Sequence, residues 1–257
     1  MGGALAQAAV KNVEPKEILL SNKTAQKAER LAQQLGCRAV DNLTAARESK
    51  FLFLGVKPQM MAGLLEEIGP VLRQRTDRVI LVTIAAGLTM ERINEMAGDV
   101  FPVIRLMPNT PVAVGEGMTA MAVNDLVTKE EAAQFQQAMA ASGRIDLLEE
   151  RLIDAHSAVA GCGPAYVCLL MEALADGGVL CGLPRKKAME YAAQMIKGTA
   201  ELYLQTGTHP AEMKDAVCSP AGSTIAGVKA LEKAGFRYGA IDAVCAAYEK
   251  TQELGKK

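Results

Sequence analysis

The first 150 residues alternate between short apolar runs and helical patterns, and this alternation limits the possible folds more than any other feature of the chain. Strands that are joined through helices of this length lie parallel in one sheet, with the helices packed on its faces. The sequence therefore predicts a parallel, helix-covered sheet. The strand signals are KEILLSN at 16–22, FLFLGV at 51–56, RVILVTIAAG at 78–87, FPVIRLMPNTP at 101–111 and GMTAMAV at 117–123.

Residues at the ends of these elements carry helix start and stop signals. We predict that Thr24 caps the helix at 25–35 and that Gly36 ends it. Thr128 and Glu131 predict a capping box before the helix that follows. The run at 51–56 is continuously apolar, which is typical of a strand buried on both faces.

The pattern changes near residue 150, after which strand signals almost disappear. The chain is therefore expected to have an α/β domain over residues 1–150 and an all-helical domain over 151–257. The predicted helices of the second domain cover 152–160, 164–180, 185–205, 210–217, 223–234 and 238–254.

Composition excludes several classes of protein. A formal net charge of -1 over 257 residues gives no reason to expect nucleic acid or an acidic membrane as a partner. No apolar run approaches the roughly 20 residues of a membrane span. The six cysteines form no Cys-x-x-Cys pair, and with only two histidines they indicate no metal site. We expect reduced cysteines and a cytoplasmic protein.

The opening stretch, MGGALAQAAV, looks like the second half of a dinucleotide-binding loop. Such a fold begins with a strand, Gly-x-Gly-x-x-Gly and a helix, and Gly2 matches the third glycine. The strand and the first two glycines are absent from the chain as written. The alternative is a simple N-terminus of small residues.

The strand signal at 16–22 leads into Ser21, Asn22 and Lys23. NAD-specific sites place an acid at the end of this strand to bind the ribose 2′-hydroxyl. A hydroxyl, an amide and an ammonium instead suit a 2′-phosphate, because each can donate a hydrogen bond and Lys23 adds charge. The stretch favours NADP over NAD, and a solvated turn is the alternative.

Three further loops follow predicted strands, at the edge where open α/β sheets bind ligands. Each could be an ordinary turn, but three small or proline-rich loops at one edge favour a cofactor site. The candidate contacts in these loops are Val56, Lys57, Pro58, Ala85, Ala86 and Asn109.

Five motifs, taken together, resemble the pyrroline-5-carboxylate reductase family over essentially the whole chain. On the cofactor side they are VKPQ at 56–59, AAGLT at 85–89 and IRLMPNTP at 104–111, followed by AVAGCGPAYV at 158–167 and CSPAGSTIAGV at 218–228. The sequence departs from the usual family residues at Ala160, Cys162, Ala221 and Ser223, all of them exchanges between small residues.

The resemblance implies a Rossmann-like NADP-binding domain, with Asn42 and Lys57 as further cofactor contacts, and reduction of pyrroline-5-carboxylate to L-proline. It implies that Ser219, Gly222, Ser223 and Thr224 bind the substrate and that Thr224 serves as the catalytic residue. The backbone N–H groups ahead of the helix at 223–234 would form an anion site for the substrate carboxylate. The alternative is that Ser223 or Thr224 merely caps this helix.

No titratable group stronger than Cys or Tyr lies within 158–171, which favours imine over ketone reduction because a cyclic imine protonates easily. The resemblance also implies a homodimer through residues 160–257, with assembly into a larger ring as a further expectation. Two rivals stay open: a related imine or hydroxyacid reductase, and a non-catalytic relative without the first strand. If that strand is missing, we expect weak cofactor binding that about ten upstream residues would restore.

Overall fold

The computed structural model describes residues 1–255 and separates the chain into two units. Unit 1 comprises residues 1–162 together with the end of the chain from Ala247 onward, and unit 2 comprises Gly163–Ala246. The chain therefore passes between the units twice. The domain boundary expected at residue 150 stays a prediction.

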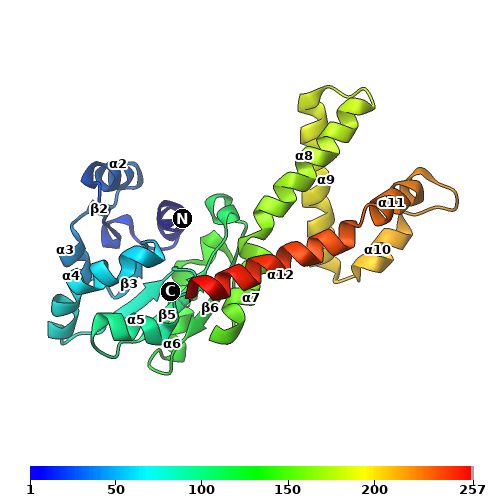
Figure 1. Cartoon of the computed structure of the whole chain (residues 1–257). Helices are drawn as coiled ribbons and strands as arrows, with labels where there is room; N and C mark the ends of the chain where they lie inside the picture. The colour runs from blue at the N-terminus through cyan, green and yellow to red at the C-terminus, as the bar shows by residue number, and fades with distance from the viewer. Residues whose placement is uncertain (256–257) are drawn as a thin grey trace. The chain divides into compact units, whose positions relative to one another are not determined.

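Unit 1 is built around a five-stranded sheet in the order β3-β4-β5-β6-β7 (Figure 1). The strands are β3 (Phe51–Leu54), β4 (Ile80–Thr83), β5 (Val103–Met107), β6 (Gly117–Val123) and β7 (Gly143–Leu147). The first three are parallel, β6 is antiparallel to β5, and β7 is parallel to β6. The prediction of an all-parallel sheet was wrong here, because the nine residues from Pro108 to Glu116 are too few for a parallel crossover.

A second, two-stranded sheet pairs β1 (Leu19–Leu20) with β2 (Arg38–Ala39) in parallel. The strand expected at 16–22 is therefore only two half-buried residues long. Within residues 1–255, β3 pairs with β4 alone, and Phe53 is 36% exposed. The expectation that 51–56 is buried on both faces was wrong, because β3 is an edge strand among the described residues.

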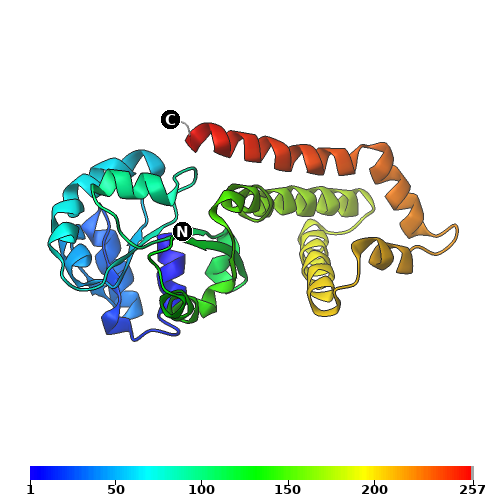
Figure 2. The ribbon, with the colours of Figure 1, turned by 90° about the horizontal axis from the view of Figure 1, so that it is seen from below.

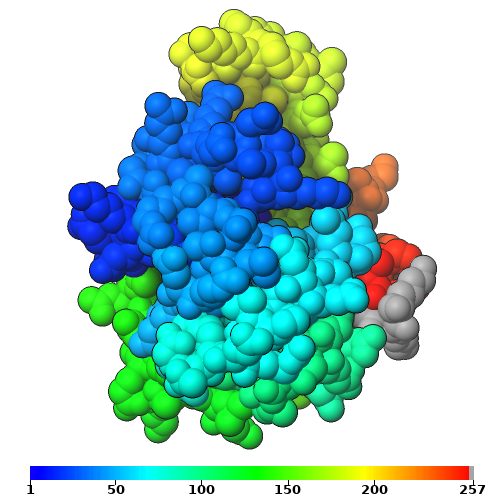
Figure 3. Space-filling view, turned by 90° about the vertical axis from the view of Figure 1, so that its left-hand side faces the viewer, coloured from blue at the N-terminus to red at the C-terminus, as the bar shows by residue number. Residues whose placement is uncertain are grey.

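Helices cover both faces of the five-stranded sheet. One face packs against α3, α4 and α5, and the other packs against α1 and α6. Alternation along β4 produces this division, since Leu81 faces the first cluster while Ile80 and Val82 face the second. The helices of unit 1 are α1 (Gly2–Ala9), α2 (Ala25–Leu35), α3 (Asn42–Glu48), α4 (Met61–Gln74), α5 (Met90–Ala97), α6 (Lys129–Ala138) and α7 (Ile153–His156). In Figure 3 the blue to cyan segments, from α2 to α4, gather on the face toward the viewer.

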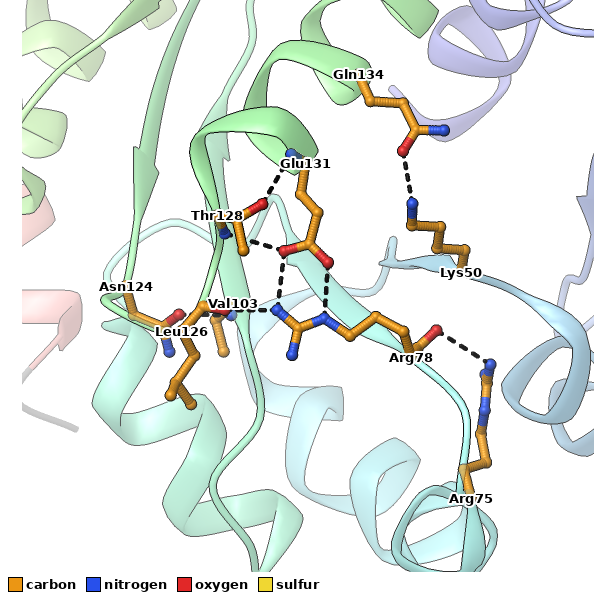
Figure 4. A network of polar contacts seen from close by, with 9 residues as sticks. All are labelled: Lys50, Arg75, Arg78, Val103, Asn124, Leu126, Thr128, Glu131 and Gln134. Carbon is orange, nitrogen blue, oxygen red and sulfur yellow. Dashed lines mark hydrogen bonds and ion pairs between the residues drawn. The ribbon is translucent and has the colours of Figure 1, made fainter.

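The helix-end predictions had mixed outcomes. The capping box of Thr128 and Glu131 is confirmed, and Glu131 also forms an ion pair with Arg78, with Nε 2.7 Å from Oε1 (Figure 4). Gly36 ends α2 in the left-handed conformation. Thr24 occupies the N-cap position of α2, but its side chain makes no capping bond. The backbone N–H of Thr24 instead donates to the Asn22 side chain.

The regular elements of unit 2 are all helices among the described residues, as the sequence predicted (Figure 2). The helices are α8 (Gly163–Leu180), α9 (Arg185–Thr206), α10 (Pro210–Ala216), α11 (Ser223–Lys233) and α12 (Phe236–Gly255), the last of which continues into unit 1. Large apolar side chains lie on the surface of these helices, with Leu180 89% exposed and Tyr238 72% exposed. Unit 2 therefore leaves much apolar area in contact with solvent.

One helical stretch of the described chain, Glu150–Leu180, is long and apolar enough by length and composition to cross a membrane. This corrects the expectation that no stretch approaches the length of a span. Only 11% of its most apolar window is buried. The criterion alone is weak evidence, because apolar helices of soluble proteins satisfy it as well.

Candidate functional site

The carboxyl ends of β3, β4 and β5 meet at one edge of the sheet, because the three strands are parallel neighbours. The loops that follow them bring six predicted residues to this edge: Val56, Lys57, Pro58, Ala85, Ala86 and Asn109. Ala85 is 2% exposed, and its N–H donates to the Thr83 hydroxyl at 3.2 Å. Lys57 is exposed and precedes the short 3₁₀ helix η2 (Pro58–Met60). The arrangement suits a cofactor lying across the strand ends, and the role of each residue stays a prediction.

A chain of hydrogen bonds lies at the carboxyl ends of β1 and β2. The Ser21 hydroxyl donates to Asn42 Oδ1 at 2.7 Å, and Asn42 Nδ2 donates to both oxygens of Glu67 at 3.2 and 3.0 Å. The structure therefore joins two residues that the sequence placed in separate cofactor predictions. Asn22 is used locally to bind the Thr24 N–H, and the exposed Lys23 forms no ion pair within residues 1–255.

Sequence reasoning missed Glu67, which places a carboxylate beside the predicted 2′-phosphate site. Glu67 belongs to α4, and it meets Asn42 because α3 and α4 pack together. No local signal predicts this contact, since the helix α3 was itself not expected from the sequence. A carboxylate here would repel a phosphate and accept a hydrogen bond from a free 2′-hydroxyl.

Gly2 begins α1 and is exposed. A β-carbon at Gly2 would meet no atom within 4 Å, whereas one at Gly3 would contact Leu31 of α2 at 3.5 Å. In a dinucleotide-binding loop, the third glycine allows the helix to pack closely on the strand. Within the described residues, Gly2 does not make such a contact. The first N–H groups of α1 have no partner inside the helix, as at every helix start. Binding of the cofactor by Gly2 stays a prediction.

Asn109 is 8% exposed, and both polar atoms of its side chain are already bonded. Its Nδ2 donates to the Ala160 carbonyl at 3.0 Å, and its Oδ1 accepts from the Met118 N–H at 3.0 Å. The predicted cofactor residue is thus also a link between the loop after β5, the strand β6 and the end of unit 1.

The predicted substrate loop forms a tight turn in unit 2. The Gly222 N–H donates to the Ser219 carbonyl at 3.0 Å, with Pro220 and Ala221 at the two central positions. Ala221 has a φ of 57°, and it is the one non-glycine residue of the described chain with a positive φ. Proline followed by a positive φ is the pattern of a type II turn, whose third position normally holds glycine. Ala221 therefore holds a strained backbone conformation in this loop.

Ser223 and Thr224 are the first two residues of α11, and Gly222 occupies its N-cap position. No side chain caps this helix, so the alternative that Ser223 or Thr224 serves as a cap was wrong. Both hydroxyls are exposed and make no side-chain hydrogen bond within residues 1–255. The hydroxyls and the first N–H groups of α11 are therefore open to a ligand, and an anion suits the N-terminal end of a helix.

Neither histidine lies among the residues predicted to bind the cofactor or the substrate. His209 accepts a hydrogen bond from the Ala211 N–H and so caps α10. Both ring nitrogens of His156 are buried without a hydrogen-bond partner, and this burial lowers the pKa of His156, while the charge of Asp146 opposes the shift. Among the described residues, no three His, Cys, Asp or Glu side chains cluster as a metal site would require.

Two family models match the chain, one in its N-terminal part and one in its C-terminal part. Residues 1–87 match the family described as NADP oxidoreductase, coenzyme F420-dependent, and residues 150–254 match that described as Pyrroline-5-carboxylate reductase dimerisation. Fold and site therefore define an NADP-dependent oxidoreductase in which a Rossmann-like domain precedes a helical dimerisation domain.

Individual relatives show to which family within this class the chain belongs. A pyrroline-5-carboxylate reductase from Synechocystis is 44% identical over the whole chain and 97% of its own length, and one from Escherichia coli is 37% identical over the whole chain and 93% of its own length. The solved pyrroline carboxylate reductase of Plasmodium falciparum, which has NADP bound, is 30% identical, with a TM-score of 0.88 over 99% of this chain and 94% of that one. The chain belongs to the pyrroline-5-carboxylate reductase family.

Proposed function

We propose that the protein reduces 1-pyrroline-5-carboxylate to L-proline with NADPH, the last step of proline biosynthesis. The observation that carries the proposal is the 44% identity over the whole chain to a reductase of this name. The common edge formed by the loops after β3, β4 and β5 supports it, because a dinucleotide binds at such an edge. We assign cofactor binding to residues 1–150, and substrate binding and dimerisation to 151–257.

Residues at three places are assigned to NADP. The loops carrying Val56, Lys57, Pro58, Ala85 and Ala86 would lie against the nicotinamide half. Gly2 is assigned to the pyrophosphate, and the group of Ser21, Asn22, Lys23 and Asn42 is assigned to the 2′-phosphate. When bound, NADPH supplies the hydride. The protein then has to orient the substrate and exclude competing water.

Binding of the substrate is assigned to the turn Ser219–Gly222 and to the start of α11. The N–H groups there, with the Ser223 hydroxyl, would bind the carboxylate, and the Thr224 hydroxyl oxygen would accept a hydrogen bond from the N–H of the protonated imine. The Thr224 hydroxyl is exposed and makes no hydrogen bond within residues 1–255, so it is free for this role. No strong acid is needed, since a cyclic imine arrives readily protonated.

The exposed apolar surface of unit 2 supports a homodimer, because the dimerisation family model covers 150–254, where many of the exposed large apolar side chains lie. Further assembly into a ring is part of the proposal, as is a cytoplasmic location. All six cysteines are unpaired, which agrees with a reducing compartment. The apolar stretch Glu150–Leu180 is then a helix that the partner subunit covers.

The decisive assay measures NADPH oxidation and proline formation with 1-pyrroline-5-carboxylate, beside a panel of cyclic imines and 2-keto acids. The proposal requires the highest kcat/KM for 1-pyrroline-5-carboxylate. A higher value for another imine or for a keto acid would favour a related reductase of different substrate. Absence of NADPH binding in a calorimetric titration would favour a non-catalytic relative.

A further inference from the structure

The carbonyl of Ala160 has no regular helical hydrogen-bond donor, and the residue at position 164 explains why. In an α-helix this carbonyl would accept from the N–H of residue 164, which is Pro164 and has no N–H. The backbone adapts through a π-turn over Ser157–Gly161, in which the Cys162 N–H reaches back to the Ser157 carbonyl at 2.9 Å. Such turns are rare and recur at functional sites.

The side chain of Asn109 supplies the donor that Pro164 cannot. Its Nδ2 lies 3.0 Å from the Ala160 oxygen, while its Oδ1 is held by the Met118 N–H of β6. Because the carboxamide is buried and both ends are bonded, it could turn toward a ligand only by breaking both hydrogen bonds. Buried groups left unpaired are expensive, so this rearrangement is strongly disfavoured.

We propose that Asn109 is a positioning residue that acts through the π-turn and does not bind the cofactor with its side chain. Asn109 lies in the loop after β5, at the edge assigned to NADP, and Ala160–Cys162 are the last residues of unit 1 before the chain enters unit 2. The hydrogen bond fixes the point from which the substrate-binding unit continues. The inference rests on the proposed function, because it assigns this point a role in the rate of the reduction.

Asn124 provides a matched control: it follows β6, and its side chain forms its hydrogen bonds at the beginning of β5, the end opposite to the loop that carries Asn109. Its Oδ1 accepts from the Val103 N–H at 3.0 Å, and its Nδ2 donates to the Phe101 carbonyl at 2.9 Å. Figure 4 shows Asn124 beside Val103. Asn109→Asp and Asn124→Asp each remove one amide donor and keep the oxygen acceptor. The two variants therefore each lose one amide hydrogen-bond donor, at opposite ends of β5.

The first measurement is hydrogen exchange over residues 157–163 in the cofactor-free protein. Asn109→Asp should speed exchange of the Cys162 N–H by about tenfold or more, because the lost bond no longer holds the turn. Asn124→Asp should leave exchange there unchanged. Adding Pro164→Ala to Asn109→Asp gives Ala160 a helical donor and should restore protection. Equal exchange in both single variants, or no recovery in the double variant, would overturn the proposal.

The second measurement separates positioning from cofactor contact. Per folded molecule, Asn109→Asp should lower kcat about tenfold to a hundredfold with KM for NADPH within about twofold, and Asn124→Asp should change neither. A higher KM for NADPH at unchanged kcat would instead make Asn109 a direct cofactor ligand and refute the proposal. A wild-type protein that forms no proline refutes the proposed function, while the exchange experiment still decides whether Asn109 holds the turn.

Discussion

Removing the charge of Glu67 tests how the residues at the ends of β1 and β2 select the cofactor. The Glu67 carboxylate is one hydrogen bond from Asn42, and Asn42 is one hydrogen bond from Ser21. A 2′-phosphate bound by Ser21 and Lys23 would therefore lie close to this negative charge. We predict that Glu67→Gln increases the preference for NADPH over NADH.

The magnitude follows from the chain of hydrogen bonds. Asn42 is part of the group assigned to the phosphate. One bond from Glu67 to Asn42 and one from Asn42 to the phosphate, of about 3 Å each and with the atoms between them, place the phosphate roughly 7 Å from the carboxylate. At this distance two unit charges in water repel by about 0.6 kcal/mol. A phosphate monoester carries about -1.5 to -2 charges, so the repulsion is about 1 kcal/mol, or about fivefold in binding. Salt should reduce the effect, because the screening length is about 3 Å at 1 M.

The assay compares kcat/KM for NADPH and NADH, with Kd values from fluorescence titration as a second readout. Glu66→Gln is the matched control, because Glu66 is an exposed neighbour on α4 without a hydrogen bond to Asn42. We expect the NADPH-to-NADH ratio to rise about fivefold in Glu67→Gln and to stay constant in Glu66→Gln. An unchanged ratio in Glu67→Gln, or an equal rise in both variants, would refute the placement of the 2′-phosphate beside Ser21.

Three further predictions concern the substrate turn and acid stability. Thr224→Ala should lower kcat/KM for the imine by about ten- to a hundredfold, since a hydrogen bond to a charged group contributes about 1.5–3 kcal/mol; an equal loss of NADPH affinity would indicate a folding defect. Ala221→Gly should raise the midpoint of urea unfolding. The variant relieves about 1–2 kcal/mol of strain in the left-handed conformation, which exceeds the roughly 0.5–1 kcal/mol entropic cost of glycine. A lower midpoint would contradict the strained turn. The hydrogen bonds from Arg78 lower the pKa of Glu131 from its ordinary value near 4.5 to about 2. Because the pKa is lower in the folded protein, the ionised Glu131 stabilises the fold by about 1–2 kcal/mol above pH 4.5, and this stabilisation is lost between pH 4.5 and 2. The free energy of unfolding of Glu131→Gln should therefore depend less on pH in that window than that of the unchanged protein.

Much of the architecture could be predicted because it depends on local pattern. Helix-period apolar residues and the change near residue 150 predicted the helices of unit 2, and Thr128 with Glu131 marked a helix start that the structure confirms. The strand positions of β3 to β6 were also predicted. The strands β2 and β7 and the helix α3 were missed, since these short segments have no strong periodicity.

The candidate site, like the fold, could be predicted from the sequence only in part. The residue types at the strand ends indicated a cofactor edge, and the proline and small residues of the 218–228 motif indicated a turn before a helix. The sequence did not show that Ser21 and Asn42 share a hydrogen bond, that Glu67 joins them, or that Asn109 is buried. Each of these depends on which helices and strands become neighbours.

By itself, the sequence determined the positions of β3 to β6, the helical character of unit 2, the family and the absence of a donor at Pro164, because these follow from residue identity and near-neighbour periodicity. Only the tertiary structure decided that β6 runs antiparallel, that Glu67 meets Asn42, and that Asn109 reaches the Ala160 carbonyl. The last contact joins residues 51 positions apart. A donor missing from the local backbone can be replaced by any polar side chain that folding brings near, and the packing of the whole unit selects which one.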